Sequence, residues 1–159
     1  MPSKLRGLKE IREIVRTEQS AGKIVVFSNG CFDLLHAGHI RYLEAAREEG
    51  DILIVAINGD DSVEALKGSG RPLMPESERA EIISAMECVD HVMIFHDSTV
   101  DRLLLLLKPD VHAKGTDYTR ESVPERETVL GYGGRIAIVG DPKNHSTRDY
   151  LEKIRKSDR

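Results

Sequence analysis

Short runs of consecutive apolar residues alternate along the chain with stretches in which apolar residues recur every three or four positions. The runs are typical of strands buried on both faces, and the spaced stretches are typical of amphipathic helices. The pattern predicts strands at residues 23–28, 51–58, 91–95, 111–113 and 135–139. It predicts helices at residues 4–18, 37–49, 60–66, 76–87, 99–107, 124–130 and from 146 onward.

Strands that alternate with helices favour a parallel sheet covered by helices on both faces. Right-handed crossovers make such a sheet doubly wound. We therefore expect an α/β fold with a Rossmann-like, five-stranded parallel sheet in a three-layer α/β/α arrangement. The 159 residues fit one domain, with a leading helix in residues 1–20 and a core in residues 21–159. Ligands of such folds bind at the carboxyl ends of strands, where the strand order reverses.

The composition is that of a folded domain, because 40% of the residues are hydrophobic and 31% are charged. The net charge of −4 argues against a broad surface for nucleic acid or membrane. Cys31 and Cys88 lie far apart without a Cys-x-x-Cys pattern, which favours reduced thiols. The charged N-terminal segment does not resemble a signal peptide, and the longest apolar run, residues 103–107, is too short to span a bilayer. We therefore expect a cytoplasmic protein with neither nucleic acid nor membrane as a partner.

Two histidines, His36 and His39, follow a turn that contains Gly30 and leaves the first expected strand. A helix that begins there would offer unpaired N–H groups and the positive end of its dipole to an anion. Gly38 has no side chain, so a phosphate can approach the backbone closely. Imidazoles three residues apart share a helix face and can donate hydrogen bonds to phosphate oxygens. The stretch therefore predicts a phosphate site.

Three other interpretations of the two histidines remain open. A metal site would need a third protein ligand, and none is evident nearby. The pair can also be ordinary histidines at a helix start. A bare phosphate-binding turn of the dinucleotide type lacks its Gly-x-Gly-x-x-Gly pattern here.

The stretch GCFDLLHAGH, residues 30–39, resembles the Gly-x-Phe-Asp-x-x-His-x-Gly-His signature of the cytidylyltransferase-like nucleotidyltransferases. The segments LKGSGRP, KPDVHAKGTDY and GGRIAIVGDPKNHST are similar to the same family, so the resemblance extends from about residue 23 to the last helix. Within the family, these segments look most like D-glycero-β-D-manno-heptose 1-phosphate adenylyltransferases, which occur alone or as the C-terminal half of a bifunctional heptose kinase/adenylyltransferase. Arg148 replaces a second Thr after Ser146-Thr147, and Thr99-Val100 replaces Thr-Pro.

The resemblance implies a nucleotidyltransferase that joins a nucleoside monophosphate, from ATP, to D-glycero-β-D-manno-heptose 1-phosphate and releases pyrophosphate. This reaction would serve the synthesis of ADP-heptose and lipopolysaccharide precursors. It also implies Mg²⁺, bound mainly through the triphosphate, with the NTP as co-substrate. A homodimer is expected, and residues 5–15 either form its interface or cover the sheet.

Two alternatives stay open. One is a CTP- or GTP-dependent enzyme for heptose or an alcohol phosphate such as glycerol 3-phosphate. The other is a nucleotide-sensing module that keeps the fold without the reaction.

The resemblance also assigns roles to individual residues, in three groups, and names no metal ligand. The catalytic residues are His36, His39 and Lys114. The nucleotide- and phosphate-binding residues are Asn29, Gly30, Cys31, Phe32, Gly38, Arg79, Ser146 and Thr147. The substrate-binding residues are Asp33, Lys67, Arg71 and Asp117.

Several of these residues have a simpler structural interpretation. Phe32 can pack, Asp33 can orient the turn through backbone N–H groups, and Asp117 can form a turn. Lys67, Arg71, Arg79 and Lys114 can be surface charges. Ser146 and Thr147 can cap the last helix. The remaining histidines, His91, His96 and His112, are expected to be structural or exposed, and residues 103–107 are expected in the core.

Overall fold

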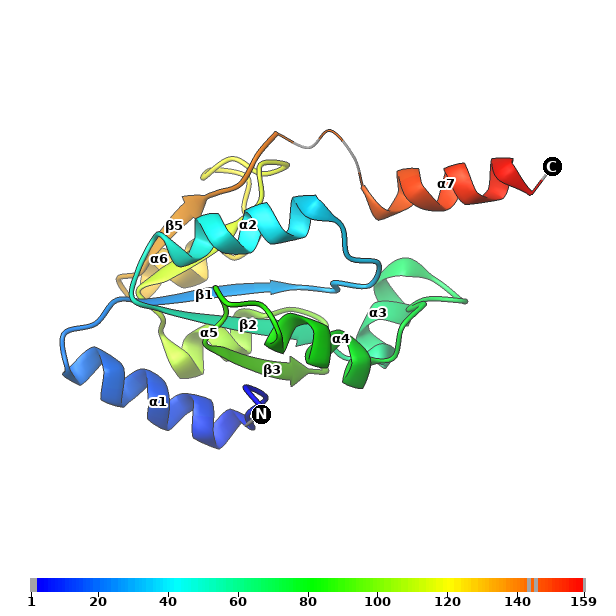
Figure 1. The fold of residues 1–159 in the computed structure, drawn as a ribbon. Helices are drawn as coiled ribbons and strands as arrows, with labels where there is room; N and C mark the ends of the chain where they lie inside the picture. The colour runs from blue at the N-terminus through cyan, green and yellow to red at the C-terminus, as the bar shows by residue number, and fades with distance from the viewer. Residues whose placement is uncertain (1–2, 143, 145, 159) are drawn as a thin grey trace.

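A computed structural model of the chain describes residues 3–142, 144 and 146–158. Its strands form one parallel sheet in the order β3-β2-β1-β4-β5, which confirms the expected fold class (Figure 1). The strands are β1 (Val25–Gly30), β2 (Ile52–Asn58), β3 (His91–Phe95), β4 (Val111–Lys114) and β5 (Arg135–Ile138).

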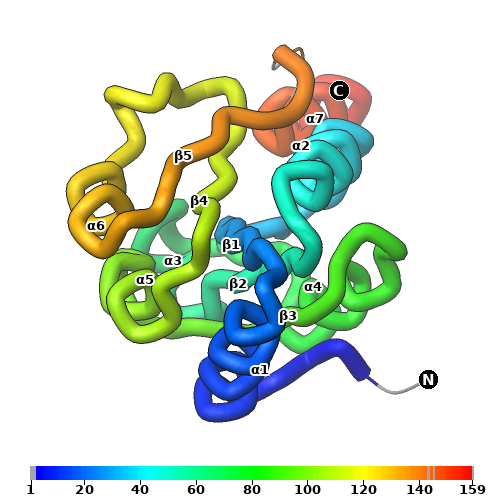
Figure 2. The backbone as a smooth tube through the Cα atoms, turned by 90° about the vertical axis from the view of Figure 1, so that its left-hand side faces the viewer, coloured from blue at the N-terminus to red at the C-terminus, as the bar shows by residue number. Residues whose placement is uncertain are grey.

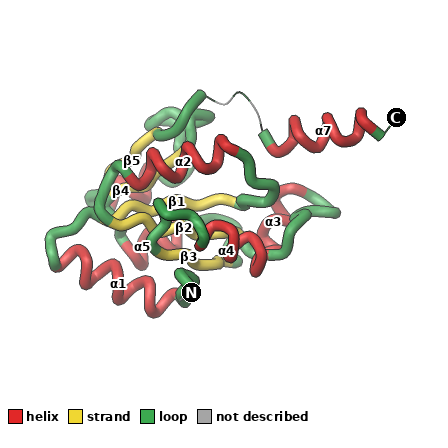
Figure 3. The backbone as a smooth tube through the Cα atoms, viewed as in Figure 1, coloured by secondary structure: helices red, strands yellow, loops and turns green. Residues whose placement is uncertain are grey.

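Helices cover both faces of the sheet. Figure 2 shows α2 and α4 on one side of the strands and α5 and α6 on the other, and Figure 3 shows the strands lying between them. Among the described residues, no helix has both the length and the apolar composition needed to cross a membrane. The helices are α1 (Leu8–Ser20), α2 (Ala37–Arg47), α3 (Asp60–Lys67), α4 (Glu76–Ser84), α5 (Asp101–Leu107), α6 (Arg126–Gly131) and α7 (Thr147–Ser157).

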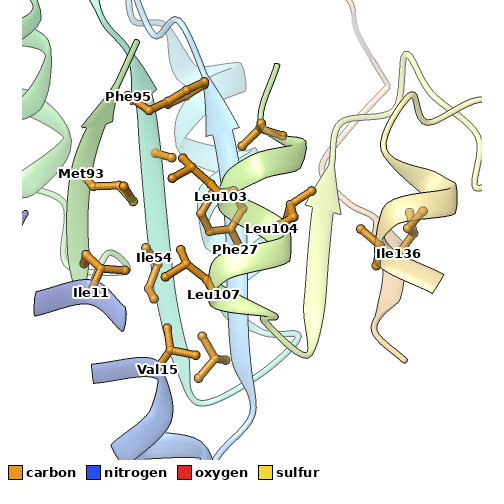
Figure 4. Close-up of a cluster of buried hydrophobic side chains, with 14 of the residues drawn as sticks. Ile11, Val15, Phe27, Ile54, Met93, Phe95, Leu103, Leu104, Leu107 and Ile136 are labelled. Atoms are coloured by element: carbon orange, nitrogen blue, oxygen red, sulfur yellow. The ribbon is translucent and has the colours of Figure 1, made fainter. Parts of the chain in front are cut away.

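The core has two clusters because successive residues of each strand point to opposite faces of the sheet. Ile54 of β2 packs with α1 and α5 in one cluster (Figure 4), whereas Leu53 and Val55 belong to the cluster beneath α2 and α4. Both clusters are closed to solvent. Because both faces of the sheet are buried, the sequences of the strands are continuous apolar runs.

The first helix begins later than the sequence predicts. Leu5 forms a parallel bridge to Val92, and the amide of Arg6 donates to the Val92 carbonyl over 2.8 Å. Pairing with the edge strand β3 satisfies backbone groups that would otherwise face water, so residues 4–6 are extended rather than helical. Ile11 and Val15 of α1 are buried, so this helix covers the sheet.

The strand order reverses between β1 and β4. β1 pairs with β2 over its whole length, and on its other side it pairs with β4 at Val26–Val111 and Phe27–His112. The Tyr42 hydroxyl of α2 donates to the Ala113 carbonyl of β4 over 2.8 Å. This bond ties the helix that follows β1 to the strand across the reversal. The carboxyl ends of β1 and β4 are therefore the expected place for a ligand.

Candidate active site

The turn that leaves β1 brings Phe32 back over the strand. Phe32 is in the left-handed region, with φ of 49°, and is buried. A Cβ on Gly30 would lie 3.0 Å from the Phe32 ring, so glycine leaves the room that this turn needs. The Phe32 ring lies 5.7 Å from the His39 ring, centroid to centroid. This position supports a packing role for Phe32, which helps to set the place of His39.

His36 and His39 hold each other at the N-terminus of α2. His36 is the N-cap residue, and its Nδ1 accepts a hydrogen bond from the Gly38 amide over 3.1 Å. Nδ1 of His39 accepts from the His36 amide over 3.2 Å. This arrangement is a capping box in which two imidazoles take the places of the usual Ser and Glu. The ring centroids lie 4.0 Å apart.

The capping bonds fix the chemical form of both rings. A backbone amide can only donate, so each Nδ1 must be the unprotonated nitrogen. A neutral imidazole then carries its proton on Nε2. His36 and His39 thus each carry a Nε2–H group at the positive dipole end of α2. This arrangement suits a phosphate anion.

Polar atoms without a hydrogen-bond partner lie where β1 separates from β4. Oγ of Ser28 and Oδ1 of Asn29 are buried, and neither has a partner among the described residues. Two residues beyond the Phe27–His112 pair, the two strands reach Asn29 and Lys114. Buried polar atoms that lack a partner are costly unless a ligand or water satisfies them. This position supports the expected role of Asn29 as a ligand contact.

The start of α7 lies against the histidine turn. Ser146 caps the helix by accepting from the Asp149 amide, so its capping interpretation is confirmed. The Thr147 hydroxyl donates to the Leu34 carbonyl over 3.0 Å, and the Tyr150 ring lies 5.7 Å from the His36 ring. The structure thus brings Thr147 to the histidine turn, with Ser146 next to it in the chain, and a nucleotide contact by either residue remains a prediction. Arg148, which replaces the second Thr, is exposed, and His145 is outside the described residues.

Asp33 points away from solvent and organises the loop at residues 68–75. Its carboxylate accepts from Nε of Arg71 over 2.7 Å, from the Leu73 amide over 2.9 Å and from the Met74 amide over 3.0 Å. Burial opposes ionisation of Asp33, but the two amides and the Arg71 guanidinium outweigh it and hold the pKa of the carboxyl below its usual value. The geometry supports the orienting role for Asp33, although the backbone it orients belongs to a distant loop.

The basic loop residues differ in their surroundings. Arg71 is partly buried by its bond to Asp33, so the sequence interpretation of a free surface charge is wrong for it. Lys67, the last residue of α3, is exposed. Substrate contacts by Arg71 and Lys67 remain predictions.

Arg79 is the most deeply enclosed charged residue described, with no exposed surface. Its guanidinium donates to the carbonyls of Met74, Cys31 and Asn58, and to Oδ1 of Asp60 over 2.8 Å. The interpretation of Arg79 as a surface charge is therefore wrong. The other interpretation, a phosphate contact, remains a prediction that this enclosure disfavours. Arg79 instead joins the β1 turn to the end of β2.

The backbone of Cys31, rather than its side chain, makes the clearest contact in the turn after β1. Its carbonyl accepts from Nη1 of Arg79 over 2.6 Å, and its thiol is half-buried. Burial raises the pKa of the Cys31 thiol, which keeps it protonated at neutral pH. Cys31 can therefore shape the phosphate turn without acting as a nucleophile.

Lys114 ends β4 and is buried except for about a tenth of its side chain. Its Nζ lies 3.7 Å from Oε2 of Glu125 and 4.8 Å from the centroid of the Tyr118 ring. The interpretation of Lys114 as a surface lysine is therefore wrong. Asp117 is exposed on the loop that follows Lys114, and its contact with a sugar remains a prediction.

Two residues beside Lys114 were not foreseen as functional. His112 is fully buried, as a structural histidine should be, and its Nε2 lies 3.5 Å from Oε2 of Glu125. Glu125 is itself buried in the last position before α6. The sequence gives no local signal for the burial of Glu125, because glutamate is usually exposed.

Possible metal ligands gather away from the histidine pair. Within the described residues, the group of three or more ligand-type side chains close enough to share an ion is Asp61, Glu76 and His96. Nδ1 of His96 lies 2.7 Å from Oδ1 of Asp61, and this hydrogen bond raises the pKa of His96. These residues follow β2 and β3 rather than the β1–β4 reversal.

Comparison with known proteins identifies a matching family and similar proteins. The family model described as cytidylyltransferase-like matches residues 27–150. The chain is 49% identical over 153 residues to the bifunctional protein HldE of Geotalea uraniireducens (strain Rf4), which covers 96% of this chain and 31% of that protein. It is 44% identical over 155 residues to HldE of Geobacter sulfurreducens (strain ATCC 51573 / DSM 12127 / PCA), with 98% and 32% covered. The chain therefore spans about a third of the length of these curated relatives.

Solved structures share the fold. A lipopolysaccharide core biosynthesis protein from Thermoplasma volcanium GSS1 matches with a TM-score of 0.65 and 28% identity, over 77% of this chain and 100% of that one. Pantothenate synthetase from Thermus thermophilus matches with a TM-score of 0.67 and 16% identity, over 96% of this chain and 70% of that one. The second likeness concerns the fold alone.

Proposed function

Because the chain belongs to the cytidylyltransferase-like family, we propose that it transfers a nucleoside monophosphate from a nucleoside triphosphate to a sugar 1-phosphate and releases pyrophosphate. The donor is ATP, the acceptor is D-glycero-β-D-manno-heptose 1-phosphate, and the product is ADP-heptose, a lipopolysaccharide precursor. Identity to bifunctional HldE proteins and the likeness to a lipopolysaccharide core biosynthesis protein support this choice.

The observation that carries the proposal is the mutual capping of His36 and His39. It places both imidazoles at the N-terminus of α2, the helix that follows β1, where the strand order reverses. Their Nε2–H groups can stabilise the charge that builds on a phosphoryl group during displacement. Because backbone bonds hold the rings, little reorganisation is needed when the charge develops.

The reaction requires positioning more than acid–base chemistry. A phosphate oxygen of the acceptor, already an anion at neutral pH, forms a bond to the α-phosphorus of the nucleotide. The bond from that phosphorus to the bridging oxygen of pyrophosphate breaks, and the electron pair leaves with pyrophosphate. No side chain has to remove a proton, so His36, His39 and Lys114 act by orienting the phosphates and neutralising their charge.

The neighbouring residues complete the site. Asn29, Gly38 and the start of α7 at Ser146 and Thr147 contact the nucleotide and its phosphates. Lys114 and the loop that carries Asp117 face the sugar phosphate.

Asp33 and Arg79 hold the surrounding backbone in place through hydrogen bonds that leave little of either side chain exposed.

Mg²⁺ is proposed as the accompanying ion. It prefers oxygen ligands, whereas the histidine pair offers nitrogen, and the Asp33 carboxylate is already bonded to protein donors. The triphosphate and water would therefore supply its ligands, and its charge would help neutralise the phosphates. We also propose that the reaction takes place in the cytoplasm and that the chain forms a homodimer, which light scattering can test.

Pyrophosphate release tests the proposal. The protein is supplied with Mg²⁺ and with ATP, CTP, GTP or UTP, each with heptose 1-phosphate or glycerol 3-phosphate. Turnover with heptose 1-phosphate and ATP supports the full assignment. Turnover with another nucleotide corrects the donor, and turnover with glycerol 3-phosphate alone contradicts the heptose assignment. The absence of turnover with every pair contradicts the nucleotidyltransferase proposal for these substrates.

A further inference from the structure

A buried polar cluster lies behind the site, on the face of the sheet opposite α2. It consists of His112 and Lys114 from β4, Tyr118 from the following loop and Glu125 from the start of α6. His112 and Lys114 are two residues apart in a strand, so their side chains point to the same face. Glu125 and His112 are both less than a tenth exposed.

One carboxylate oxygen of Glu125 lies close to both residues of β4 in this cluster. Oε2 of Glu125 lies 3.5 Å from Nε2 of His112 and 3.7 Å from Nζ of Lys114. Burial lowers the pKa of His112, so that histidine is neutral at pH 7. Burial also disfavours the charge of Glu125, but contact with His112 and the charge of Lys114 outweigh it and lower the pKa of Glu125. The cluster therefore contains one anion and one cation, balanced in a region with little water.

The same cluster links the two ends of a loop. Lys114 is the last residue before the loop at residues 115–124, and Glu125 is the first residue after it. The ion pair therefore joins the two ends of a segment that carries Asp117. Tyr118, inside the loop, packs its ring beside the Lys114 ammonium and against the core cluster.

We propose that Glu125 is a positioning residue for Lys114 in nucleotidyl transfer, an inference that rests on the proposed function. The Glu125 carboxylate and the Tyr118 ring hold the Lys114 ammonium at the carboxyl end of β4. The 3.7 Å separation from Glu125 is an ion pair longer than a hydrogen bond, so the three donors of the ammonium can still be directed to phosphate oxygens. Protein kinases use a Lys–Glu pair in the same way to present a lysine to phosphates. His112 supports the carboxylate without adding a charge.

A double-mutant cycle on activity tests this role. Glu125→Gln keeps the size of the side chain but removes its charge, and displacement of a reacting group by about 1 Å can cost roughly 100-fold. We expect Glu125→Gln to lower kcat/KM for the sugar 1-phosphate by tenfold or more. In a Lys114→Met background the same change should alter kcat/KM by less than about twofold, because its effect passes through Lys114. Glu125→Asp keeps the charge and should fall between Glu125→Gln and the wild-type protein. Glu121→Gln, the same change at an exposed residue of the loop, is the matched control and should behave like the wild-type protein.

An equal loss in both backgrounds would overturn the proposal, because a merely structural role does not need Lys114. A second readout separates this inference from the function itself: urea unfolding of the wild-type protein, Glu125→Gln, Lys114→Met and the double variant. Lys114→Met should lower the unfolding midpoint by leaving a buried carboxylate unpaired, and adding Glu125→Gln should raise it again. If the wild-type protein catalyses no transfer, the proposed function fails, and the positioning role in catalysis fails with it even where this coupling is found. If the wild-type protein is active, but the effects of Glu125→Gln and Lys114→Met simply add in both kcat/KM and the unfolding midpoint, the positioning role alone is overturned.

Discussion

Nδ1 of His39 accepts a hydrogen bond from the backbone amide of His36 over 3.2 Å, so the second histidine caps the residue that carries the first. The reciprocal bond, from the Gly38 amide to Nδ1 of His36, completes the box. Each imidazole thus has its Nδ1 engaged in the cap and carries its proton on Nε2. The two roles can be separated by mutation.

We expect His36→Asn to retain the helix cap and to lose catalytic activity. An asparagine oxygen can accept from the Gly38 amide, so unfolding free energy should change by less than about 1 kcal/mol. The Nε2–H donor is lost, which should lower kcat by roughly 100- to 1,000-fold. His36→Ala should lose the same activity and about 1 kcal/mol more stability. Urea unfolding and pyrophosphate release measure both, and a fully active His36→Asn variant would contradict the role of Nε2.

Asp33→Asn should weaken the protein in a pH-dependent way. The folded protein lowers the pKa of Asp33, so its contribution to stability is fully present above the ordinary carboxyl pKa and is lost as pH falls through the folded value. Loss of the charge opposite Arg71 should cost about 2–4 kcal/mol at pH 7. The difference between the two proteins should shrink below about pH 4. Unfolding followed from pH 7 to pH 2 checks this, and a difference that does not depend on pH would contradict it.

Arg79→Met should be strongly destabilising. The buried guanidinium donates hydrogen bonds to three carbonyls and to the Asp60 carboxylate, and a methionine would leave these acceptors without this donor. We expect a loss of about 3–5 kcal/mol. Arg126→Met, at an exposed arginine of α6, is the matched control and should change stability by less than about 0.5 kcal/mol. Equal midpoints for the two variants would contradict the structural role of Arg79.

Tyr42→Phe tests the link across the strand reversal. The hydroxyl of Tyr42 bonds the Ala113 carbonyl, one residue before Lys114. Removing it should cost about 1 kcal/mol of stability, since the carbonyl loses a partner. A small shift of α2 relative to β4 should also lower kcat/KM, because the histidines and Lys114 lie on these two elements. Unchanged activity in a destabilised variant would show that the bond serves stability alone.

The strands, and the position of His36 and His39 at a helix start, could be predicted because each depends on a short stretch of sequence. Continuous apolar runs mark strands buried on both faces, and the spacing of His36 and His39 places both rings at one helix start. Residues 4–6 were mispredicted because their helical spacing continues into α1, whereas pairing with Val92 of the edge strand is a tertiary event.

The surroundings of the site depend on contacts between distant segments. Arg79 bonds a carbonyl 48 residues away, and Asp33 bonds an amide 40 residues away. Neither spacing leaves a periodic signal, so an enclosed arginine and an exposed one look alike in sequence. The burial of Glu125 has the same origin, because it depends on how α6 returns to the end of β4.

The measurement that tests the central claim most directly is ³¹P nuclear magnetic resonance of the protein with ATP, Mg²⁺ and heptose 1-phosphate. Attack at the α-phosphorus predicts a new pair of coupled diphosphodiester signals together with pyrophosphate. The signals should be absent with His39→Gln, which can keep the capping bond but lacks the imidazole. Formation of ADP with a second phosphate on the sugar, or of ADP and free phosphate, would place the attack at the γ-phosphorus and contradict the account.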